Sequence, residues 1–138
     1  MRIVGVDPVG SIYAYFEKHG TVPPAEELAF YLIDGIGQSY VPDSYWPDTI
    51  DDVVTVDDRT AYRTVFELAR SEAIFTGSSG GAAAFAAREL ARTLPAEALV
   101  VTLFPDSGER YLSKLNRDWL AEKNLLDPDE FFPPAQAD

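Results

Sequence analysis

The sequence predicts an α/β fold, a three-layer arrangement in which helices flank a mainly parallel sheet. Three short β-branched apolar runs, at 3–6, 52–56 and 99–104, are typical of strands buried on both faces. Helical patterns separate these runs, and strands that alternate with helices indicate an α/β layered domain. The length of 138 residues corresponds to roughly one domain at about 150 residues each. A thin sheet leaves an edge strand unpaired, so we expect the fold to be incomplete alone and completed by a second chain.

The first strand is followed by the least regular part of the chain. Residues 3–6 end at Asp7-Pro8, a pair that closes a strand and starts a loop. Residues 10–50 are dense in glycine, proline and scattered aromatics, which predicts loops and turns with one short helical piece over 25–32. A connection as long as 10–50 inside a small domain usually has a function, such as binding a ligand.

Helical patterns follow the second strand. Asp57 or Asp58 is expected to cap a helix whose apolar stripe is formed by Ala61, Val65, Leu68 and Ala69. Residues 82–94 predict an alanine-rich helix that stops at Pro95, and residues 110–123 predict a final helical stretch. The tail at 127–138 contains three prolines and no periodicity, so we expect a loosely held extension.

Composition and charge exclude several classes of function. The chain has 11 basic and 23 acidic residues, so a nucleic acid or an anionic membrane surface would meet repulsion; solubility is the plainer explanation of the acidity. Without cysteine there are no disulfides, and with His19 as the one histidine no His-based triad or metal site is expected. No apolar stretch is long enough to span a bilayer or to form a signal peptide, so a cytoplasmic protein is expected.

Three turns of small residues offer places where a ligand could approach the backbone. Gly77–Gly81 precedes the alanine-rich helix and is either a ligand-contacting turn, such as an anion cradle, or a serine N-cap with glycines for tight packing. Asp34–Gly37 is by itself a weak signal, and Pro105–Gly108 follows a strand at the end where open α/β sheets gather ligands. No serine has a histidine base to activate it. Three turns that allow a ligand to approach the backbone, in a chain without an activated nucleophile, indicate one wall of an active site.

In chain order, several motifs resemble the C-terminal part of the catalytic core of the cystathionine β-synthase and cysteine synthase family. The resemblance runs from residue 2 to about residue 126, with 127–138 as a proline-rich tail. The segments that carry it are Val4-Gly5-Val6-Asp7-Pro8 with Gly10-Ser11, Ile33-Asp34-Gly35-Ile36-Gly37 with Tyr40-Val41-Pro42, Gly77-Ser78-Ser79-Gly80, Pro105-Asp106-Ser107-Gly108-Glu109-Arg110-Tyr111-Leu112-Ser113, and Asp118-Trp119-Leu120 before Lys123-Asn124-Leu125-Leu126.

The resemblance implies a cofactor, pyridoxal 5′-phosphate, and roles for particular residues. Family members replace or eliminate the β-substituent of serine, O-acetylserine or a related amino acid. Ser78 matches the serine whose hydroxyl contacts the pyridine nitrogen, a neutral contact that makes the ring a weaker electron sink than a carboxylate would. The implied pocket-lining residues are Gly35, Ile36, Gly37, Gly77, Pro105 and Asp106. No catalytic residue and no metal ligand is implied in this chain.

This chain has no match to three features of the family: the Schiff-base lysine, an asparagine at the cofactor oxygen, and the phosphate loop. Because the resemblance assigns phosphate binding to that loop, Gly77–Gly81 is no longer interpreted as an anion cradle. The expected partner is therefore an N-terminal-half subunit that carries the lysine and the phosphate loop, in a higher heteromer that shares the cofactor. Met1 falls just before a strand, where a split is best tolerated, which favours a natural split over a truncated fragment. The alternative is a catalytically inactive paralogue that acts as an interaction or regulatory module.

Overall fold

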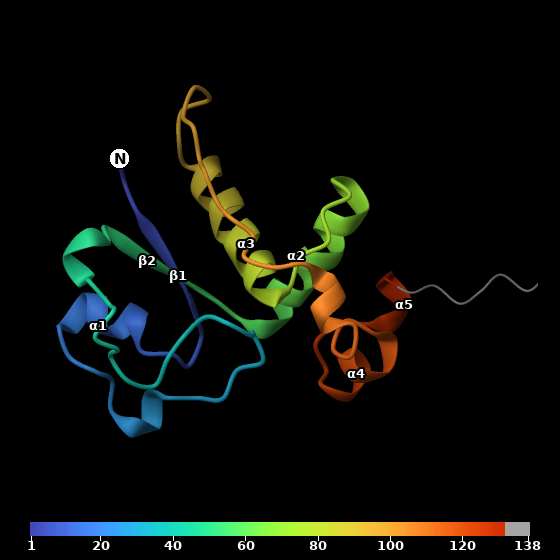
Figure 1. Ribbon diagram of the computed structural model, residues 1–138, viewed down its shortest axis with the longest axis horizontal. Coiled ribbons are helices and arrows are strands. Elements are labelled where there is room, and N and C mark those ends of the chain that lie inside the picture. The colour runs from blue at the N-terminus through green and yellow to red at the C-terminus, as the bar shows by residue number, and fades with distance from the viewer. Residues whose placement is uncertain (132–138) are drawn as a thin grey trace, which may run out of the picture.

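The computed structural model describes residues 1–131 of the chain, and within them the sheet has two strands. β1 (Val4–Pro8) and β2 (Asp52–Val56) run parallel, with Val4 opposite Asp52 and Pro8 opposite Val56. The helices are α1 (Tyr13–His19), α2 (Asp58–Ser71), α3 (Ser78–Arg92), α4 (Arg117–Glu122) and α5 (Pro128–Phe131). Single 3₁₀ turns occupy Ala25–Glu27, Pro47–Thr49 and Gly108–Tyr111. Figure 1 shows this order along the chain.

The two faces of the sheet are covered by different helices, because successive side chains of a strand point to opposite faces. Val6 packs against the buried cluster that includes Ala82 and Ala86 of α3. Its neighbour Asp7 points the other way, and its carboxylate accepts a hydrogen bond of 3.0 Å from the amide of Ala14 in α1. The predicted α/β layering is confirmed, with α1 and α3 on opposite sides of a sheet smaller than expected.

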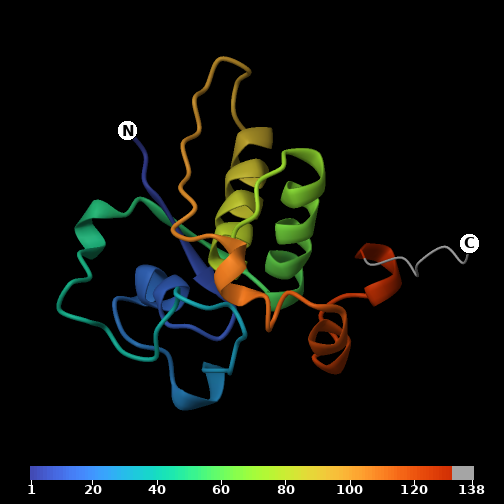
Figure 2. The same cartoon turned by 45° about the vertical axis from the view of Figure 1, so that its right-hand side comes forward.

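The predicted strand over 99–104 is wrong. These residues are extended but pair with no strand among the described residues, as the segment that follows α3 in Figure 2 shows. Leu99, Val101 and Leu103 are 87%, 80% and 72% exposed. A strand requires a neighbour for its backbone hydrogen bonds, and residues 1–131 supply none here.

Helix α2 begins where the sequence predicts, and the two candidate caps have different partners. The carboxylate of Asp57 accepts a hydrogen bond from the amide of Thr60 at 2.9 Å, as an N-cap does. The carboxylate of Asp58 instead accepts from the amides of Leu32 and Ile33, at 2.8 and 3.1 Å. Asp57 is therefore the cap, and Asp58 fixes the segment that leads into the Asp34–Gly37 turn.

Four other expectations for the chain need correction. The helical piece over 25–32 is a single turn at Ala25–Glu27, and the stretch over 110–123 divides into a 3₁₀ turn and the short helix α4. Helix α1 falls in the region predicted as loops and turns; the αL conformation of Gly20, at φ 68°, ends it. The first residues of the expected loose tail form α5, and the rest of that tail lies outside the described residues.

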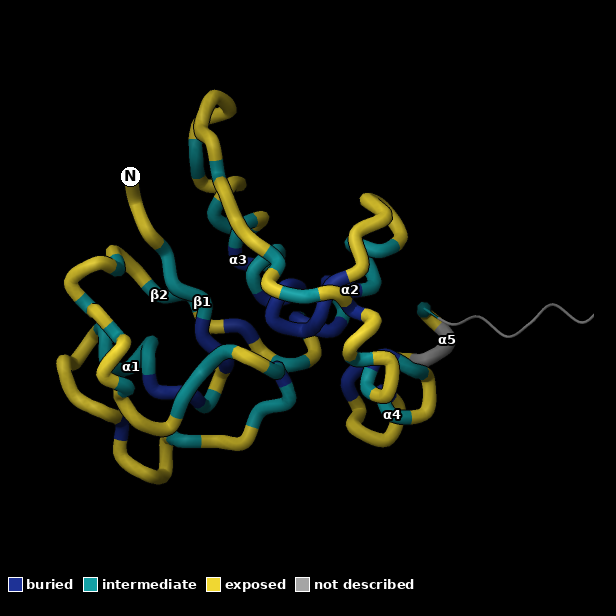
Figure 3. The backbone as a smooth tube through the Cα atoms, in the orientation of Figure 1, coloured by how far each residue is buried: buried dark blue, intermediate teal, exposed yellow. Residues whose placement is uncertain are grey.

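The core lies where α2 meets its neighbours. One buried cluster joins Tyr62 and Val65 to Leu115, Leu120 and the pair 125–126, and a second joins the sheet to α2 and α3. Figure 3 shows that burial concentrates at the α2–α3 crossing, while the outer ends of both helices are exposed.

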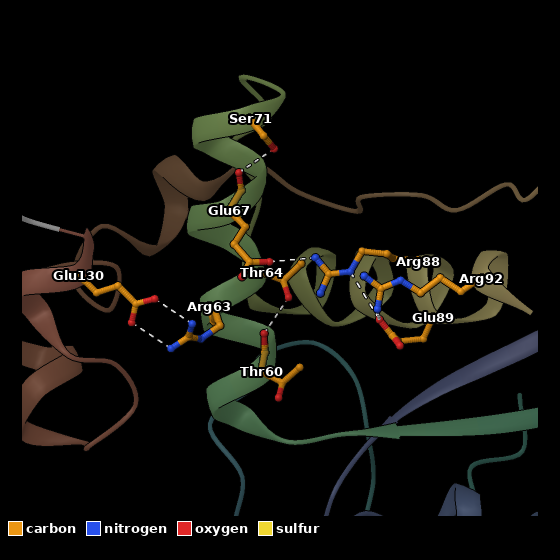
Figure 4. Close-up of polar contacts among 9 residues, drawn as sticks. All are labelled: Thr60, Arg63, Thr64, Glu67, Ser71, Arg88, Glu89, Arg92 and Glu130. Atoms are coloured by element: carbon orange, nitrogen blue, oxygen red, sulfur yellow. Dashed lines mark hydrogen bonds and ion pairs between the residues drawn. The ribbon is translucent and has the colours of Figure 1, made fainter.

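Two ion pairs at the surface connect α2 to α3 and to α5. Arg88 of α3 reaches Glu67 of α2 at 2.9 Å, and Arg63 of α2 reaches Glu130 of α5 at 2.8 Å (Figure 4). These exposed pairs orient the helices more than they stabilise them.

Candidate functional site

The predicted turn at Asp34–Gly37 lies against the first turn of α3. The amide of Asp34 donates a hydrogen bond of 3.0 Å to the hydroxyl of Ser78, and Ser78 is 2% exposed. Gly77, not a serine, is the N-cap residue, and no side chain caps the helix. The serine N-cap interpretation of Gly77–Gly81 is therefore wrong, and the buried hydroxyl of Ser78 serves the neighbouring turn instead.

The glycines of this segment are required by close packing, as one interpretation of the sequence expected. A Cβ on Gly80 would lie 2.0 Å from the hydroxyl of Thr76, and one on Gly81 would lie 2.2 Å from the carbonyl oxygen of Ala61. A Cβ on Gly77 would lie 2.6 Å from Asp106. Because glycine has no Cβ, α3 can begin in close contact with Thr76, Ala61 and Asp106.

The Pro105–Gly108 turn meets the same helix end. The amide of Gly77 donates to the carboxylate of Asp106 at 3.3 Å, and the hydroxyl of Thr76 donates to the Asp106 carbonyl at 3.1 Å. Tyr111 also donates its hydroxyl proton to the Asp106 carboxylate, a bond that raises the pKa of the Tyr111 hydroxyl above its ordinary value. Exposed Pro105 precedes this anchored aspartate.

An ion pair joins the site to the chain that follows. The ammonium of Lys114 lies 2.7 and 2.6 Å from the two carboxylate oxygens of Asp34, and both side chains are about one third exposed. Asp34 therefore contacts Ser78 through its amide and Lys114 through its side chain.

Tyr62 of α2 forms the inner wall of the cluster. Its hydroxyl donates to the carbonyl of Leu32 at 3.1 Å. Burial is the largest cause that raises the pKa of this hydroxyl, and a hydrogen bond with Ser78 offsets the rise in part. Tyr62 is thus a neutral group beside Ser78.

The two glycines of the Asp34–Gly37 turn have positive φ angles of 84° at Gly35 and 80° at Gly37. A Cβ on Gly37 would lie 2.6 Å from the Tyr31 hydroxyl, whereas one on Gly35 would meet nothing within 4 Å. Ile36 packs inward against the cluster around Ile33. Gly35 therefore presents the open side of the turn, and Gly37 its packed side.

Among the described residues, the assembled cluster holds no nucleophile beside a base. Its ionisable groups hold one another, as the Asp34–Lys114 and Asp106–Tyr111 contacts show. Within residues 1–131, no group of three or more His, Asp or Glu side chains could hold a metal ion. In the part of the chain that the structure describes, no helix is both long and apolar enough to cross a membrane.

The three turns are predicted from the sequence, but the side chains that join them are not. Asp34, Tyr62, Tyr111 and Lys114 are not among the pocket residues that the sequence predicts. Lys114 and Asp34 are 80 residues apart, and no local pattern reports a pair over such a separation.

Comparison with known proteins assigns the family. The family described as pyridoxal-phosphate dependent enzyme matches residues 1–106. The O-acetylserine dependent cystathionine beta-synthase of Bacillus subtilis is 40% identical over 114 residues, which are 83% of this chain and 34% of that protein. The cysteine synthase of Helicobacter pylori is 37% identical over 114 residues, again 83% of this chain and 34% of the relative.

Solved structures agree with the sequence relatives. The crystal structure of the O-acetylserine dependent cystathionine beta-synthase from Helicobacter pylori superposes with a TM-score of 0.69 at 34% identity, over 83% of this chain and 34% of that one. An O-ureido-L-serine synthase superposes with a TM-score of 0.70 at 34% identity, over 82% and 33%. The chain spans about a third of the length of these relatives. By sequence and by fold, the chain belongs to the pyridoxal-phosphate-dependent enzyme family of the cystathionine β-synthases and cysteine synthases.

Proposed function

We propose that this chain is one subunit of a split pyridoxal-phosphate-dependent enzyme that carries out β-replacement or β-elimination on serine, O-acetylserine or a related amino acid. The observation that carries the proposal is the buried Ser78 hydroxyl, held by the turn that contains Gly35. The relatives named above support the reaction class, since they are a β-synthase, a cysteine synthase and an O-ureido-L-serine synthase.

The residues present fit one side of the cofactor. The Ser78 oxygen accepts one hydrogen bond from Asp34, so its own proton is available to a neutral acceptor such as a pyridine nitrogen. The hydroxyl of Tyr62 is the neighbour that competes for this proton. When bound, the cofactor supplies an electron sink for bond breaking at the α-carbon of the amino acid.

The other parts of this chain position the substrate side. The open face of Gly35 allows close approach of a ligand to the backbone. The Lys114–Asp34 pair keeps this turn against Ser78, and the contacts of Asp106 hold the third turn on the helix end.

The lysines of this chain support a requirement for a second subunit. They are Lys18, Lys114 and Lys123; both carboxylate oxygens of Asp34 hold Lys114, and Glu122 holds Lys123 at 2.8 Å. None lies in a motif that resembles the family's Schiff-base lysine. Large exposed side chains in the irregular segment, Phe30 at 89%, Trp46 at 70% and Tyr40 at 59%, offer apolar surface to a partner.

The test begins with the tagged chain purified from its source cells. We expect it to be recovered with a family member that carries the lysine and the phosphate loop, in the cytoplasmic fraction. The two purified chains together should release acetate from O-acetylserine in the presence of a thiol. The chain alone, given excess pyridoxal phosphate, should show no turnover and no borohydride-trapped lysine.

Two outcomes contradict the proposal. One is a chain that turns over alone with cofactor trapped on one of its own lysines. The other is recovery without any family partner, which would favour the inactive interaction module; no observation in this structure favours that alternative.

A further inference from the structure

An apolar groove lies between β1, α3 and the extended segment 99–102. It has a volume of about 420 Å³. Its walls include Val4 and Val6 of β1, Ala83 and Ala87 of α3, and Leu99 and Val101 of the extended segment. The groove is separate from the Ser78 cluster, whose residues do not line it.

One wall of the groove is a sheet edge with backbone groups directed toward it. The carbonyl of Ile3 accepts from Asp51, and the amide of Val9 donates to the carbonyl of Val56, so these odd-numbered residues face β2. Backbone groups alternate in direction along a parallel strand. The amides and carbonyls of Val4 and Val6 therefore point to the opposite edge, where the described part of the chain places no strand.

The opposite wall has the composition of a strand but no strand partner. The run Leu99–Phe104 is apolar except for Thr102. Leu99, Val101 and Leu103 are highly exposed and Thr102 is exposed too, while Val100 and Phe104 are half-buried. Exposed apolar strand edges of this kind associate with another strand unless they are covered.

The floor of the groove is formed by small side chains of α3. Ala83 and Ala87 are half-buried and lie one helical turn apart, with Leu90 continuing the row. Alanines leave room for larger side chains from an element laid across them. This floor suits a strand with bulky apolar residues on the face that it turns toward α3.

We propose that the groove receives one β-strand of the partner subunit, inserted between β1 and 99–104, so that the sheet continues across both chains. This inference rests on the proposed function, since the strand comes from the chain that supplies the rest of the family fold. The match covers 34% of the B. subtilis relative, and in the proposed split enzyme the partner subunit supplies the remainder of the family fold. Strand addition provides main-chain hydrogen bonds for affinity and side-chain contacts for specificity.

The test uses the complex of the two purified chains and a pair of matched α3 variants. Ala87→Phe fills the groove, whereas Ala84→Phe makes the same change at a half-buried alanine of α3 that does not line it. We expect Ala87→Phe to weaken partner binding by at least about tenfold. Ala84→Phe should change it by less than about threefold, and both variants should keep the wild-type circular dichroism.

Hydrogen exchange supplies a readout specific for strand insertion. In the complex, the amides of Val4 and Val6 and those of 100–103 should become protected together. Amides near Trp46 report contact elsewhere on the surface. Protection confined to the Trp46 region, or equal binding of the two α3 variants in an active complex, would overturn the groove proposal and leave the split enzyme standing. Failure to form any complex with a family member would overturn both.

Discussion

The amide of Asp34 and the hydroxyl of Ser78 lie 3.0 Å apart and join two segments that are 44 residues apart in the sequence. The carboxylate of the same aspartate holds Lys114, 80 residues further along the chain. One residue thus connects the glycine turn, the start of α3 and the segment before α4. The site is assembled by a few long-range polar contacts, and each of them can be removed separately.

Replacing Ser78 by alanine should destabilise the chain. Ser78→Ala leaves the partly buried amide of Asp34 without its acceptor, which costs about 1–3 kcal/mol of unfolding free energy. Urea denaturation measures the change. Ser71→Ala is the control, because its exposed hydroxyl donates to the Glu67 carbonyl near the end of α2, and it should cost less than about 0.5 kcal/mol. Equal losses of unfolding free energy in the two variants would show that the Ser78–Asp34 hydrogen bond contributes no more than an exposed one.

In the proposed two-chain enzyme, Ser78→Ala and Ser78→Asp should have different effects on cofactor binding and turnover. Loss of the hydroxyl should weaken cofactor binding about ten- to a hundredfold. A carboxylate would keep the pyridine protonated, so turnover with Ser78→Asp should collapse while cofactor still binds. Cofactor affinity by fluorescence titration and the β-replacement rate separate the two effects. Full activity in both variants would exclude Ser78 from the cofactor site.

The Asp34–Lys114 pair should show a measurable coupling. Both side chains are about one third exposed, so solvent screening limits the coupling energy to about 0.5–1 kcal/mol. A double-mutant cycle with Asp34→Asn and Lys114→Met measures it, and 1 M salt should reduce it. The Glu89–Arg92 pair, with its arginine 65% exposed, is the comparison and should couple by less. Equal coupling in both pairs would contradict an anchoring role.

The contact between α2 and α3 depends on Gly81. Gly81→Ala would place a Cβ 2.2 Å from the carbonyl oxygen of Ala61, so the two helices must separate at a cost of about 1–3 kcal/mol. Thermal or urea unfolding measures it. Gly5→Ala is the control, since its Cβ would approach no closer than 3.4 Å to Val53, and it should change stability by less than about 0.5 kcal/mol.

Asp7 should make stability depend on pH in a defined direction. Its carboxyl is 1% exposed, and burial raises its pKa above the ordinary value of 3.8, with the Ser11 hydroxyl and the Ala14 amide offsetting the rise in part. The folded state therefore binds the proton more tightly than the unfolded chain. The resulting stabilisation is complete below pH 3.8 and is lost as the pH rises through the folded-state pKa.

The variant Asp7→Asn isolates this effect from the other carboxylates. It keeps an oxygen that can accept from Ala14 but carries no titrating proton. The unfolding free energy of the wild type minus that of the variant should therefore decrease between pH 3.8 and neutrality. A difference that stays constant over this range would show that Asp7 does not titrate differently in the folded state.

The sequence alone determined the features that depend on neighbouring residues. The apolar runs at β1 and β2, the stripe of α2 and the alanine-rich α3 are confirmed, because hydrophobic periodicity and helix propensity act over a few residues. Asp57 was one of two predicted caps, and its bond to Thr60 lies within one turn. The order of the glycine turns also identified the family.

Tertiary structure decided the features that need a distant partner. The run 99–104 has strand composition but remains unpaired, because strand formation requires backbone hydrogen bonds from another segment. Ser78 was a candidate cap in the sequence, yet its hydroxyl accepts from Asp34, since the helix starts at Gly77 and the turn approaches from another part of the chain. The fold alone places the Asp34 carboxylate against Lys114. Each of these three features depends on which distant segments of the chain lie next to one another, and no local sequence pattern encodes that proximity.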